Sequence, residues 1–349
     1  MRRARLLAFS LLVLALVVAA GEGVCRALWT EQQVAPLDPA NVIFRDHPTL
    51  FWVQRPFLDE KMRPHGRLRT NSLGLRNEEV ALPRPPGVYR ILSLGESSTW
   101  GASVDLQDTY SKRFQQLLNQ DRHVRGGPTY EVINAGVGAY SSWQSSVYLR
   151  ESGLALDPQM VLVYHLKNDR LPRGVVDRHN YLYSVSSTDR RLYERRRLMA
   201  PALNVLYESR LYFALRRWGM LTFFRQSAQV PPGQSIPGLG ARVPDEDRLA
   251  ALSSMAEVCK ARGVRMVVIK PVYGTAEPDE LLAAFAADHQ LPFIDLAAVK
   301  DSGAWGTNNT ALFNDLVHPS ADGHRLIARA IYAALDTQGI LARMTPPGK

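Results

Sequence analysis

The sequence predicts an α/β fold in which a mostly parallel sheet is covered by helices on both faces. Short apolar runs alternate with longer segments whose apolar residues recur with a helical period, as in chains built from βαβ units. The run at residues 160–166 is apolar at nearly every position, as expected of a central parallel strand buried on both faces. Five runs are predicted as strands: residues 91–94, 130–137, 160–166, 264–272 and 292–295.

Helices are predicted between these strands and after the last of them. Segment 109–119 follows the first strand, and segment 141–153 follows the second. Residues 245–262 form a periodic segment that stops at Gly263, and glycine commonly ends helices because it adopts the left-handed conformation without strain. A closing helix is predicted at residues 324–335. We therefore assign residues 88–345 to one α/β domain.

The N-terminus has the pattern of an export segment. Three arginines at positions 2, 3 and 5 precede an almost unbroken apolar run at residues 6–20, as a basic n-region precedes an h-region. Such a run spans roughly 22 Å as a helix, less than a ~30 Å hydrocarbon core, which favours a cleaved signal. The arginines equally suit an uncleaved anchor, because basic residues are retained on the cytoplasmic side. Both interpretations of residues 1–25 place the bulk of the chain outside the cytoplasm.

Residues 26–87 are predicted as a stalk followed by an extended segment that packs on the α/β domain. Proline recurs throughout this stretch, and no long helical period is present. Proline lacks a backbone donor and disrupts helix interiors. We therefore expect no long helix between the export segment and the first strand of the sheet.

A long insertion at residues 170–244 carries most of the excess positive charge. Residues 170–225 contain twelve arginines and four acidic residues, whereas the whole chain has a formal net charge of +9. Nine aromatic residues are interspersed, and residues 198–224 have helical spacing. Two interpretations are open: a basic, aromatic lid over the carboxyl edge of the sheet that sets substrate choice, or a helical pair with an aromatic core and a solvated basic face. Anionic glycans or lipid headgroups are favoured as partners over nucleic acid, because export is expected.

The composition argues against metal and cofactor chemistry. Two cysteines, Cys25 and Cys259, do not make a disulfide framework, and neither has metal-ligand spacing around it. We expect no metal site, and we also expect no cofactor. An apolar fraction of 46% in 349 residues is sufficient for a full core.

Three polar stretches are positioned to meet at one edge of the predicted sheet. A Gly-Glu-Ser turn ending at Ser97 follows the first strand, where α/β sheets present nucleophiles. Asn168 follows the third strand, and an Asp-x-x-His sequence, Asp315 to His318, precedes the closing helix. Each stretch alone is a weak signal, because loop asparagines, loop acids and helix-capping histidines are common. Their joint occurrence favours a shared site.

The chemistry of these side chains suggests a serine nucleophile. A serine hydroxyl reacts slowly at neutral pH unless a base lies within hydrogen-bond reach. His318 is the candidate base, and Asp315, three residues earlier, can orient the imidazole and stabilise its cation. The predicted catalytic residues are therefore Ser97, Asp315 and His318.

Together with a fourth block at residues 132–140, these stretches resemble the SGNH hydrolases, also called the GDSL esterase/lipase superfamily. The four blocks follow one another in the chain order of that superfamily, and the resemblance covers roughly residues 88–335. It implies a three-layer α/β/α sandwich with a mostly parallel, flavodoxin-like sheet of five strands.

The resemblance also implies roles for individual residues. Its register makes Ser97 the nucleophile and leaves Ser98 a turn or N-cap role. It implies an oxyanion hole made of the backbone N–H groups of Ser97 and Ala139 and the side-chain amide of Asn168. The alternative for Asn168 is that it is an ordinary loop residue without a catalytic role.

Three residues depart from the superfamily pattern. Glu96 stands where aspartate is usual, Ala139 where the second block usually has glycine, and Leu166 where glycine usually precedes the asparagine by two positions. A backbone donor survives replacement of glycine by alanine if φ is negative, whereas a positive φ is strained. These departures bear on the shape of the acyl pocket more than on the catalytic groups.

The sequence as a whole predicts an exported serine hydrolase that cleaves or transfers a small O-acyl group on an acylated small molecule or glycan. One alternative is a carbohydrate O-acetyltransferase or acetylesterase acting on cell-envelope polysaccharide. A rival from another class is a non-catalytic, membrane-tethered glycan-binding or assembly protein on the same fold. The intact set of serine, aspartate, histidine and asparagine favours an enzyme.

Overall fold

The computed structural model divides the chain into two compact units. We call them the N-terminal unit, comprising Met1–Arg55 and Tyr183–Ser235, and the sheet unit, comprising Pro56–Leu182 and Ile236–Lys349. The residues that the structure describes are 2–28, 43–47, 49–62, 66–125, 127–171, 177, 205–206, 209–212, 214–215, 240–275, 279–304 and 309–344.

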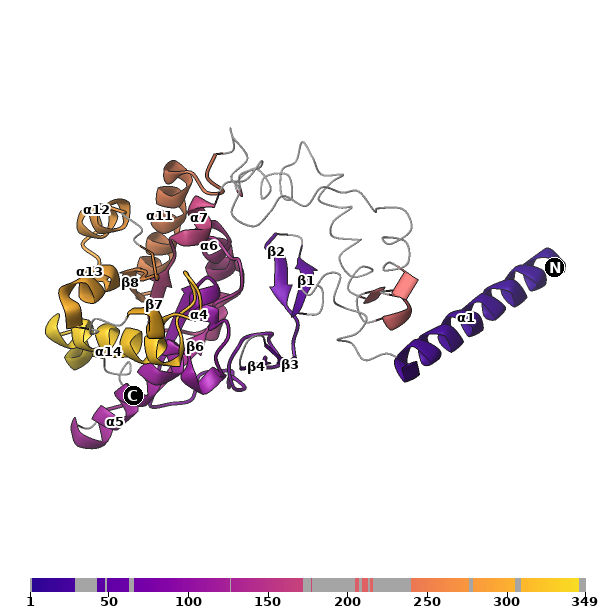
Figure 1. Ribbon diagram of the computed structural model, residues 1–349, viewed down its shortest axis with the longest axis horizontal. Coiled ribbons are helices and arrows are strands. Elements are labelled where there is room, and N and C mark those ends of the chain that lie inside the picture. The colour runs from indigo at the N-terminus through magenta and orange to yellow at the C-terminus, as the bar shows by residue number, and fades with distance from the viewer. Residues whose placement is uncertain are drawn as a thin grey trace. The chain divides into compact units, whose positions relative to one another are not determined.

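A five-stranded sheet organises the sheet unit (Figure 1). Its strands run parallel in the order β6-β5-β7-β8-β9. This order, with helices between the strands, confirms the predicted α/β fold with a flavodoxin-like sheet. The strands are β5 (Val88–Gly95), β6 (Thr129–Asn134), β7 (Met160–Tyr164), β8 (Arg265–Lys270) and β9 (Phe293–Asp295).

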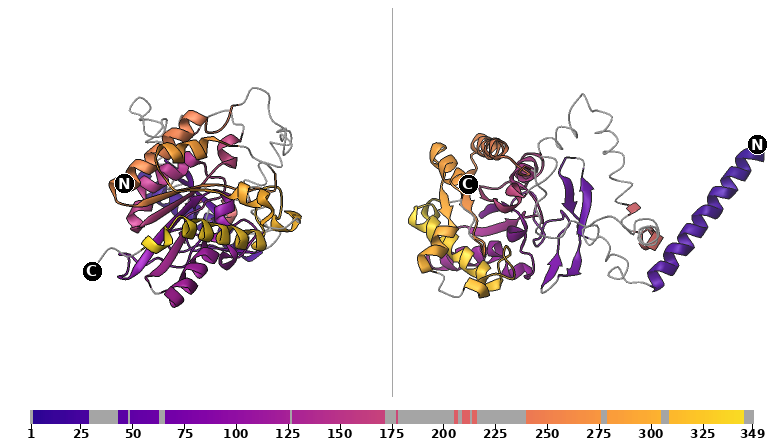
Figure 2. Two further views of the ribbon diagram at one scale, coloured as in Figure 1. Left: turned by 90° about the vertical axis from the view of Figure 1, so that its left-hand side faces the viewer. Right: turned by 45° about the horizontal axis from the view of Figure 1, so that its top comes forward.

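Helices cover both faces of the sheet, which makes three layers (Figure 2). Two helices, α5 (Tyr110–Arg125) and α14 (Ala321–Thr337), share a hydrophobic cluster with one face. The opposite face packs against α6 (Ser142–Glu151), α11 (Asp245–Ala261) and α12 (Leu281–Asp288).

The central strand β7 shows why the sequence forms this arrangement. Met160, Leu162 and Tyr164 belong to the cluster beneath α5 and α14, whereas Val161 and Val163 belong to the cluster on the other face. Side chains alternate between the faces of a strand, so a strand covered on both sides must be apolar at every position. All five of these side chains are at most 1% exposed.

The helices lie close to where the sequence predicts them, with different ends. The closing helix begins at Ala321 rather than at residue 324, because the Ser320 hydroxyl caps it by accepting from the Gly323 N–H group at 3.3 Å. Helix α12 has no counterpart in the prediction. Short helical turns complete the unit: α4 (Ser97–Trp100), Leu106–Asp108, Gly153–Leu156, α7 (Lys167–Arg170), α13 (Leu296–Val299), Lys300–Ala304, Asn309–Leu312 and Leu341–Arg343.

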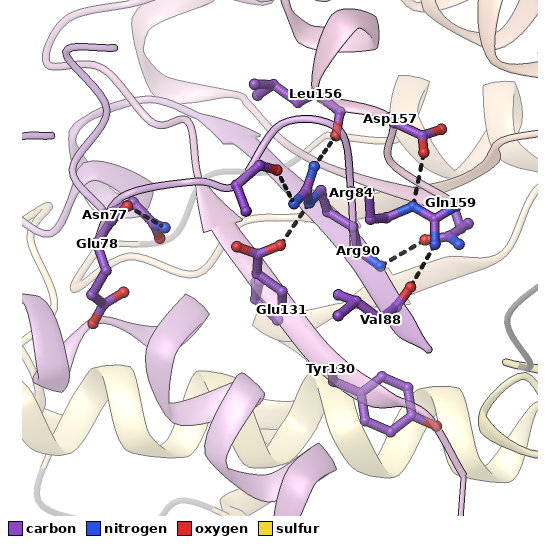
Figure 3. Close-up of polar contacts among 12 residues, drawn as sticks. Asn77, Glu78, Arg84, Val88, Arg90, Tyr130, Glu131, Leu156, Asp157 and Gln159 are labelled. Carbon is purple, nitrogen blue, oxygen red and sulfur yellow. Dashed lines mark hydrogen bonds and ion pairs between the residues drawn. The ribbon is translucent and has the colours of Figure 1, made fainter. Parts of the chain in front are cut away.

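A buried arginine holds the N-terminal edge of the sheet together (Figure 3). Arg90 on β5 has no exposed surface. Its guanidinium donates to the Glu131 carboxylate on β6 at 2.6 Å and to the carbonyl oxygens of Leu156 and Ala81 at 2.5 and 2.9 Å. Because Ala81 precedes the first strand of the sheet, this contact attaches part of the predicted extended segment to the α/β domain.

The segment before the sheet contains two hairpins that the sequence does not reveal. In the N-terminal unit β1 (Phe44–His47) pairs antiparallel with β2 (Phe51–Gln54). In the sheet unit β3 (Asp59–Lys61) pairs antiparallel with β4 (Arg67–Arg69). These strands are only three or four residues long, so their hydrophobic patterns are too short to recognise.

The N-terminal helix α1 (Arg2–Leu28) is longer than the apolar run suggested. Residues Arg5–Leu28, 24 residues in length, are apolar enough to cross a membrane. At 1.5 Å per residue they span about 36 Å, a length and composition that suit both a signal sequence and an uncleaved anchor. Near the end of the helix, the Glu22 carboxylate accepts from the Ser209 hydroxyl at 2.7 Å and the Leu211 N–H group at 2.9 Å.

Candidate active site

The topology of the sheet selects the edge at which the site lies. From β5 the chain crosses to β6 on one side, and it then returns past β5 to β7 on the other side. The carboxyl ends of β5 and β7 therefore flank a topological switch point, where open α/β sheets bind ligands. Ser97 follows β5 and Asn168 follows β7, which brings two predicted site residues to this position.

A tight turn presents Ser97. Strand β5 ends at Gly95 and helix α4 begins at Ser97, so only Glu96 separates strand from helix. A Cβ atom on Gly95 would lie 1.9 Å from the Thr99 hydroxyl oxygen and 2.9 Å from the Tyr164 carbonyl oxygen. Gly136 also faces α4 closely, since a Cβ there would lie 2.4 Å from the Trp100 backbone nitrogen. Glycine at both positions lets this turn lie directly against its neighbours.

Ser97, His318 and Asp315 form a continuous line of hydrogen bonds. The His318 Nε2 atom lies 2.9 Å from the Ser97 hydroxyl oxygen. On the other side of the ring, Nδ1 lies 2.7 Å from the Asp315 Oδ2 atom. The second carboxylate oxygen of Asp315 accepts from the Val317 and His318 N–H groups at 2.7 Å each. The structure thus brings together all three residues predicted to act as nucleophile, base and orienting acid.

The loop geometry keeps Asp315 ionised. Partial burial acts to raise the pKa of Asp315, but the hydrogen bonds from the His318 ring and from two backbone N–H groups outweigh it and lower the pKa. An ionised Asp315 can only accept a hydrogen bond, so in a neutral imidazole the proton is on Nδ1. Nε2 of His318 is then the acceptor for the Ser97 hydroxyl. Nε2 is the nitrogen that a base needs to direct at the nucleophile.

Of the two roles expected for Ser98, turn or N-cap, the structure gives it the position in the turn. The N-cap position of α4 is Glu96, and Ser98 lies inside the helical turn with a fully buried side chain. Its hydroxyl lies 3.4 Å from the Val317 carbonyl oxygen. Ser98 therefore joins the turn that carries Ser97 to the loop that carries His318, whereas the half-buried Ser97 directs its hydroxyl at the imidazole.

Asn168 and Ala139, the other predicted oxyanion residues, belong to neighbouring loops that are bonded to each other. The Asn168 side-chain nitrogen donates to the Tyr140 carbonyl oxygen at 2.9 Å, which uses one of its two N–H groups. Ala139 adopts a φ of +62°. This left-handed conformation costs an alanine about 1–2 kcal/mol, so the strain expected for a positive φ is present here. Leu166, in contrast, has an extended φ of −165°, which any residue adopts.

Glu96, the residue directly before Ser97, is buried. Its carboxylate accepts from the Asn168 backbone N–H group at 2.9 Å and from the Tyr273 hydroxyl at 2.5 Å, and only 1% of its surface is exposed. Burial raises the pKa of Glu96 to about 7, although these hydrogen bonds act in the opposite direction. Glu96, directly before Ser97, is thus hydrogen-bonded to Asn168, whose side-chain amide is predicted to bind the oxyanion.

This raised pKa makes stability depend on pH. An acid whose pKa rises from 4.5 to about 7 on folding stabilises the protein fully below pH 4.5 and loses that contribution as pH rises to about 7. Replacing Glu96 with glutamine removes the titration, so the variant should gain about 2–3 kcal/mol relative to wild type between pH 5 and pH 8. In thermal unfolding measured at pH 5 and at pH 8, we expect the difference in melting temperature, variant minus wild type, to be about 5–10 °C larger at pH 8.

The control for this prediction is Glu257→Gln, which changes an exposed carboxylate on α11. The difference in melting temperature for this variant should be equal at the two pH values. An equal difference for Glu96→Gln as well would show that Glu96 does not titrate in this range.

The two ends of the insertion meet beside the site. The Val243 N–H group donates to the Asp169 carbonyl oxygen at 2.9 Å, and the Asp177 N–H group donates to the Arg242 carbonyl oxygen at 3.1 Å. The side chains of Asp177 and Arg242 form an ion pair at 2.9 Å in which both are 1% exposed. Most of residues 178–239, including nearly all of the predicted helical segment 198–224, lies outside the described residues.

Two residues of this region escape prediction from sequence. Tyr273 follows β8 and bonds Glu96, and a search of every strand's carboxyl end would have included it, because parallel strands end at one edge. Arg242 lies in a Pro/Gly-rich stretch with no local pattern, and only its contacts identify it.

Comparison with known proteins gives structural similarities at low sequence identity. No protein-family model matches the chain, and no curated protein matches its sequence. Axe2, an acetylxylan esterase from Geobacillus stearothermophilus, is 16% identical with a TM-score of 0.41, covering 71% of this chain and 94% of that one. A lipase/acylhydrolase from Enterococcus faecalis is 16% identical with a TM-score of 0.42, covering 75% of this chain and all of the other.

A third similar structure is a protein assigned to the G-D-S-L lipolytic family, from Desulfitobacterium hafniense. It is 12% identical with a TM-score of 0.41, and the match covers 70% of this chain and 99% of that one. The geometry of Ser97, His318 and Asp315, rather than these similarities, carries the functional proposal.

Proposed function

We propose that this chain is a membrane-anchored serine hydrolase that cleaves or transfers a small acyl group on oxygen. The observation that carries the proposal is the line of hydrogen bonds from the Ser97 hydroxyl through His318 to Asp315, at 2.9 and 2.7 Å. A serine aligned with an imidazole and an ionised acid is the arrangement that activates a hydroxyl for acyl transfer.

The first half-reaction forms an acyl-enzyme. The Ser97 oxygen attacks the ester carbonyl carbon while Nε2 of His318 takes the hydroxyl proton. The carbonyl oxygen becomes an oxyanion, for which the donors are the Ser97 and Ala139 N–H groups and the amide of Asn168. When the tetrahedral intermediate collapses, the bond to the alcohol oxygen breaks, and His318 returns the proton to that oxygen.

The second half-reaction decides between hydrolysis and transfer. Water, or a hydroxyl group of an acceptor, loses its proton to His318 as its oxygen attacks the acyl carbon. The bond to the Ser97 oxygen then breaks, and His318 reprotonates the serine. Water yields a carboxylic acid, whereas a sugar hydroxyl yields a new ester. The same residues support both outcomes, so the acceptor that reaches the acyl-enzyme determines the reaction.

An anionic substrate is favoured by the charge of the insertion. Residues 170–225 carry twelve arginines and four acidic residues, which would concentrate an anionic polymer near the sheet edge where the insertion is rooted. A cell-envelope polysaccharide that carries both acidic groups and O-acetyl esters would be a substrate of this kind, in agreement with the acetylesterase or O-acetyltransferase alternative. If the protein instead has a non-catalytic glycan-binding role on the same fold, replacing Ser97 should leave the rate of hydrolysis of every ester unchanged.

Helix α1 is proposed to hold the enzyme at the membrane. Its apolar stretch Arg5–Leu28 is long enough to span the hydrocarbon core. Arginines at positions 2, 3 and 5 would keep its start in the cytoplasm, so that the sheet unit lies outside.

One experiment tests activity and location together. Cells producing the full chain are separated into soluble and membrane fractions, and both are assayed with p-nitrophenyl esters of increasing chain length. We expect activity above background to sediment with the membranes and to be highest for acetate, with the Ser97→Ala variant as the blank. Activity in the soluble fraction with Met1 intact would contradict the anchor, and equal hydrolysis by the Ser97→Ala membranes would contradict the nucleophile.

A further inference from the structure

Ala139 has a conformation that its own side chain disfavours. Its φ of +62° is left-handed, and it is exposed, so burial of its methyl group does not hold it in place. The orientation of its N–H group matters to the proposed function, because that group is a proposed oxyanion donor. Another interaction must therefore keep the backbone of Ala139 in the left-handed conformation.

Arg242 supplies such an interaction. Its Nη1 atom donates to the Ala139 carbonyl oxygen at 2.5 Å. The same guanidinium donates through Nε to both carboxylate oxygens of Asp177 at 2.9 Å, and through Nη2 to the Gln144 side chain. The planar guanidinium therefore joins the loop of Ala139, the first turn of α6 and the start of the insertion.

The ion pair between Arg242 and Asp177 is buried. Arg242 and Asp177 are each 1% exposed, so neither charge is screened by water. Asp177 also accepts from the Ser141 hydroxyl at 2.6 Å, and Ser141 caps α6 two residues after Ala139. Residues on both sides of the Ala139–Tyr140 peptide are thus tied to one ion pair.

We propose that Arg242 is a positioning residue that holds Ala139 in its left-handed conformation and so aims the oxyanion donor, with Asp177 fixing the guanidinium. This inference rests on the proposed function. Because Asp177 and Arg242 lie at opposite ends of the insertion, it makes the roots of the insertion part of the catalytic arrangement. Any shortening of residues 170–244 then has to retain both.

The test uses Arg242→Lys alone and combined with Ala139→Gly, in the full-length, detergent-solubilised protein. Lysine keeps a positive charge beside Asp177, so the protein is expected to fold, but its ammonium cannot reproduce the fork to three partners. Hydrolysis of p-nitrophenyl acetate is measured per active site, with active sites counted by complete reaction with a fluorophosphonate. A matched control, Arg90→Lys, changes an equally buried arginine at the opposite edge of the sheet.

We expect Arg242→Lys to lower kcat about 100-fold with KM changed less than threefold, as when an oxyanion donor is lost. In the Ala139→Gly background the same change should lower kcat less than about tenfold, because glycine reaches a positive φ without help. Arg90→Lys should lower the melting temperature without changing kcat per active site.

Three results would overturn the inference. An unchanged kcat per active site in Arg242→Lys would show that Arg242 only stabilises the fold. Equal losses in the two backgrounds would show that it does not act through Ala139. A wild-type protein that neither hydrolyses esters nor reacts with the fluorophosphonate would overturn the proposed function together with this inference, whereas the first two results leave the proposed function intact.

Discussion

Replacing Ser97 with alanine is expected to lower kcat for p-nitrophenyl acetate by about 10⁴–10⁶, with the protein still folded. The hydroxyl is the only group of Ser97 that changes, and without it no acyl-enzyme can form. A small residual rate over water should persist, because the oxyanion donors remain in place. The measurement is turnover by the purified protein, compared with wild type at equal concentration and similar melting temperature.

Ser98→Ala is the matched control for this prediction. Ser98 is the next residue, and its hydroxyl contacts the Val317 carbonyl oxygen rather than the imidazole. The variant should retain kcat within about tenfold, because only a long hydrogen bond of 3.4 Å is lost. The reverse pattern, with Ser98→Ala inactive and Ser97→Ala active, would identify Ser98 as the nucleophile.

Replacing Asn168 with alanine is expected to lower kcat by about 10²–10³ and to change KM only a few-fold. The amide is proposed to bind charge that exists only in the transition state, so its removal should act on kcat. The backbone N–H group that donates to Glu96 is retained in the variant, which keeps the loop attached.

The matched control is Asn119→Ala, which removes another amide with a structural bond. Asn119 donates to the Tyr130 carbonyl oxygen at 2.8 Å on the α5 side of the sheet. This variant should lose stability and keep its kcat. A similar loss of kcat in both variants, or a loss in KM alone for Asn168→Ala, would place Asn168 outside the oxyanion hole.

Local pattern was sufficient to predict the sheet. The five apolar runs become β5 to β9, because a strand covered on both faces must be apolar along its length, as β7 shows. Strand order followed from the family resemblance and is confirmed by the pairing of β5 with both β6 and β7. Short hairpins such as β3 and β4 escaped prediction because three residues carry no period.

Candidate residues whose proposed roles depend on their position along the chain could be predicted from sequence. Ser97 follows a strand, and Asp315 and His318 are three residues apart, so spacing and chain order identify them. Arg242 acts through a contact with Ala139, which lies 103 positions away in the chain. Tyr273 acts through a contact with Glu96, which lies 177 positions away. No local pattern records such contacts, and they became visible only when the carboxyl edge of the sheet was assembled.

The conformation of Ala139 lies between these two cases. The comparison with glycine raised the question of a positive φ, but sequence gives no value for a dihedral angle. The structure has φ at +62° and also places Arg242 on the carbonyl oxygen of that residue. Backbone strain at a functional loop is retained when surrounding groups stabilise it.

The central claim, that Ser97 is activated as a nucleophile, is tested most directly by its covalent reaction with a fluorophosphonate. The Ser97 oxygen should displace fluoride at phosphorus, and mass spectrometry of the digested protein should find one phosphonyl group, on the peptide that contains Ser97. His318→Gln should react far more slowly, and Ser97→Ala not at all. Absence of labelling in the folded wild-type protein, or labelling at another serine that persists in Ser97→Ala, would contradict the account.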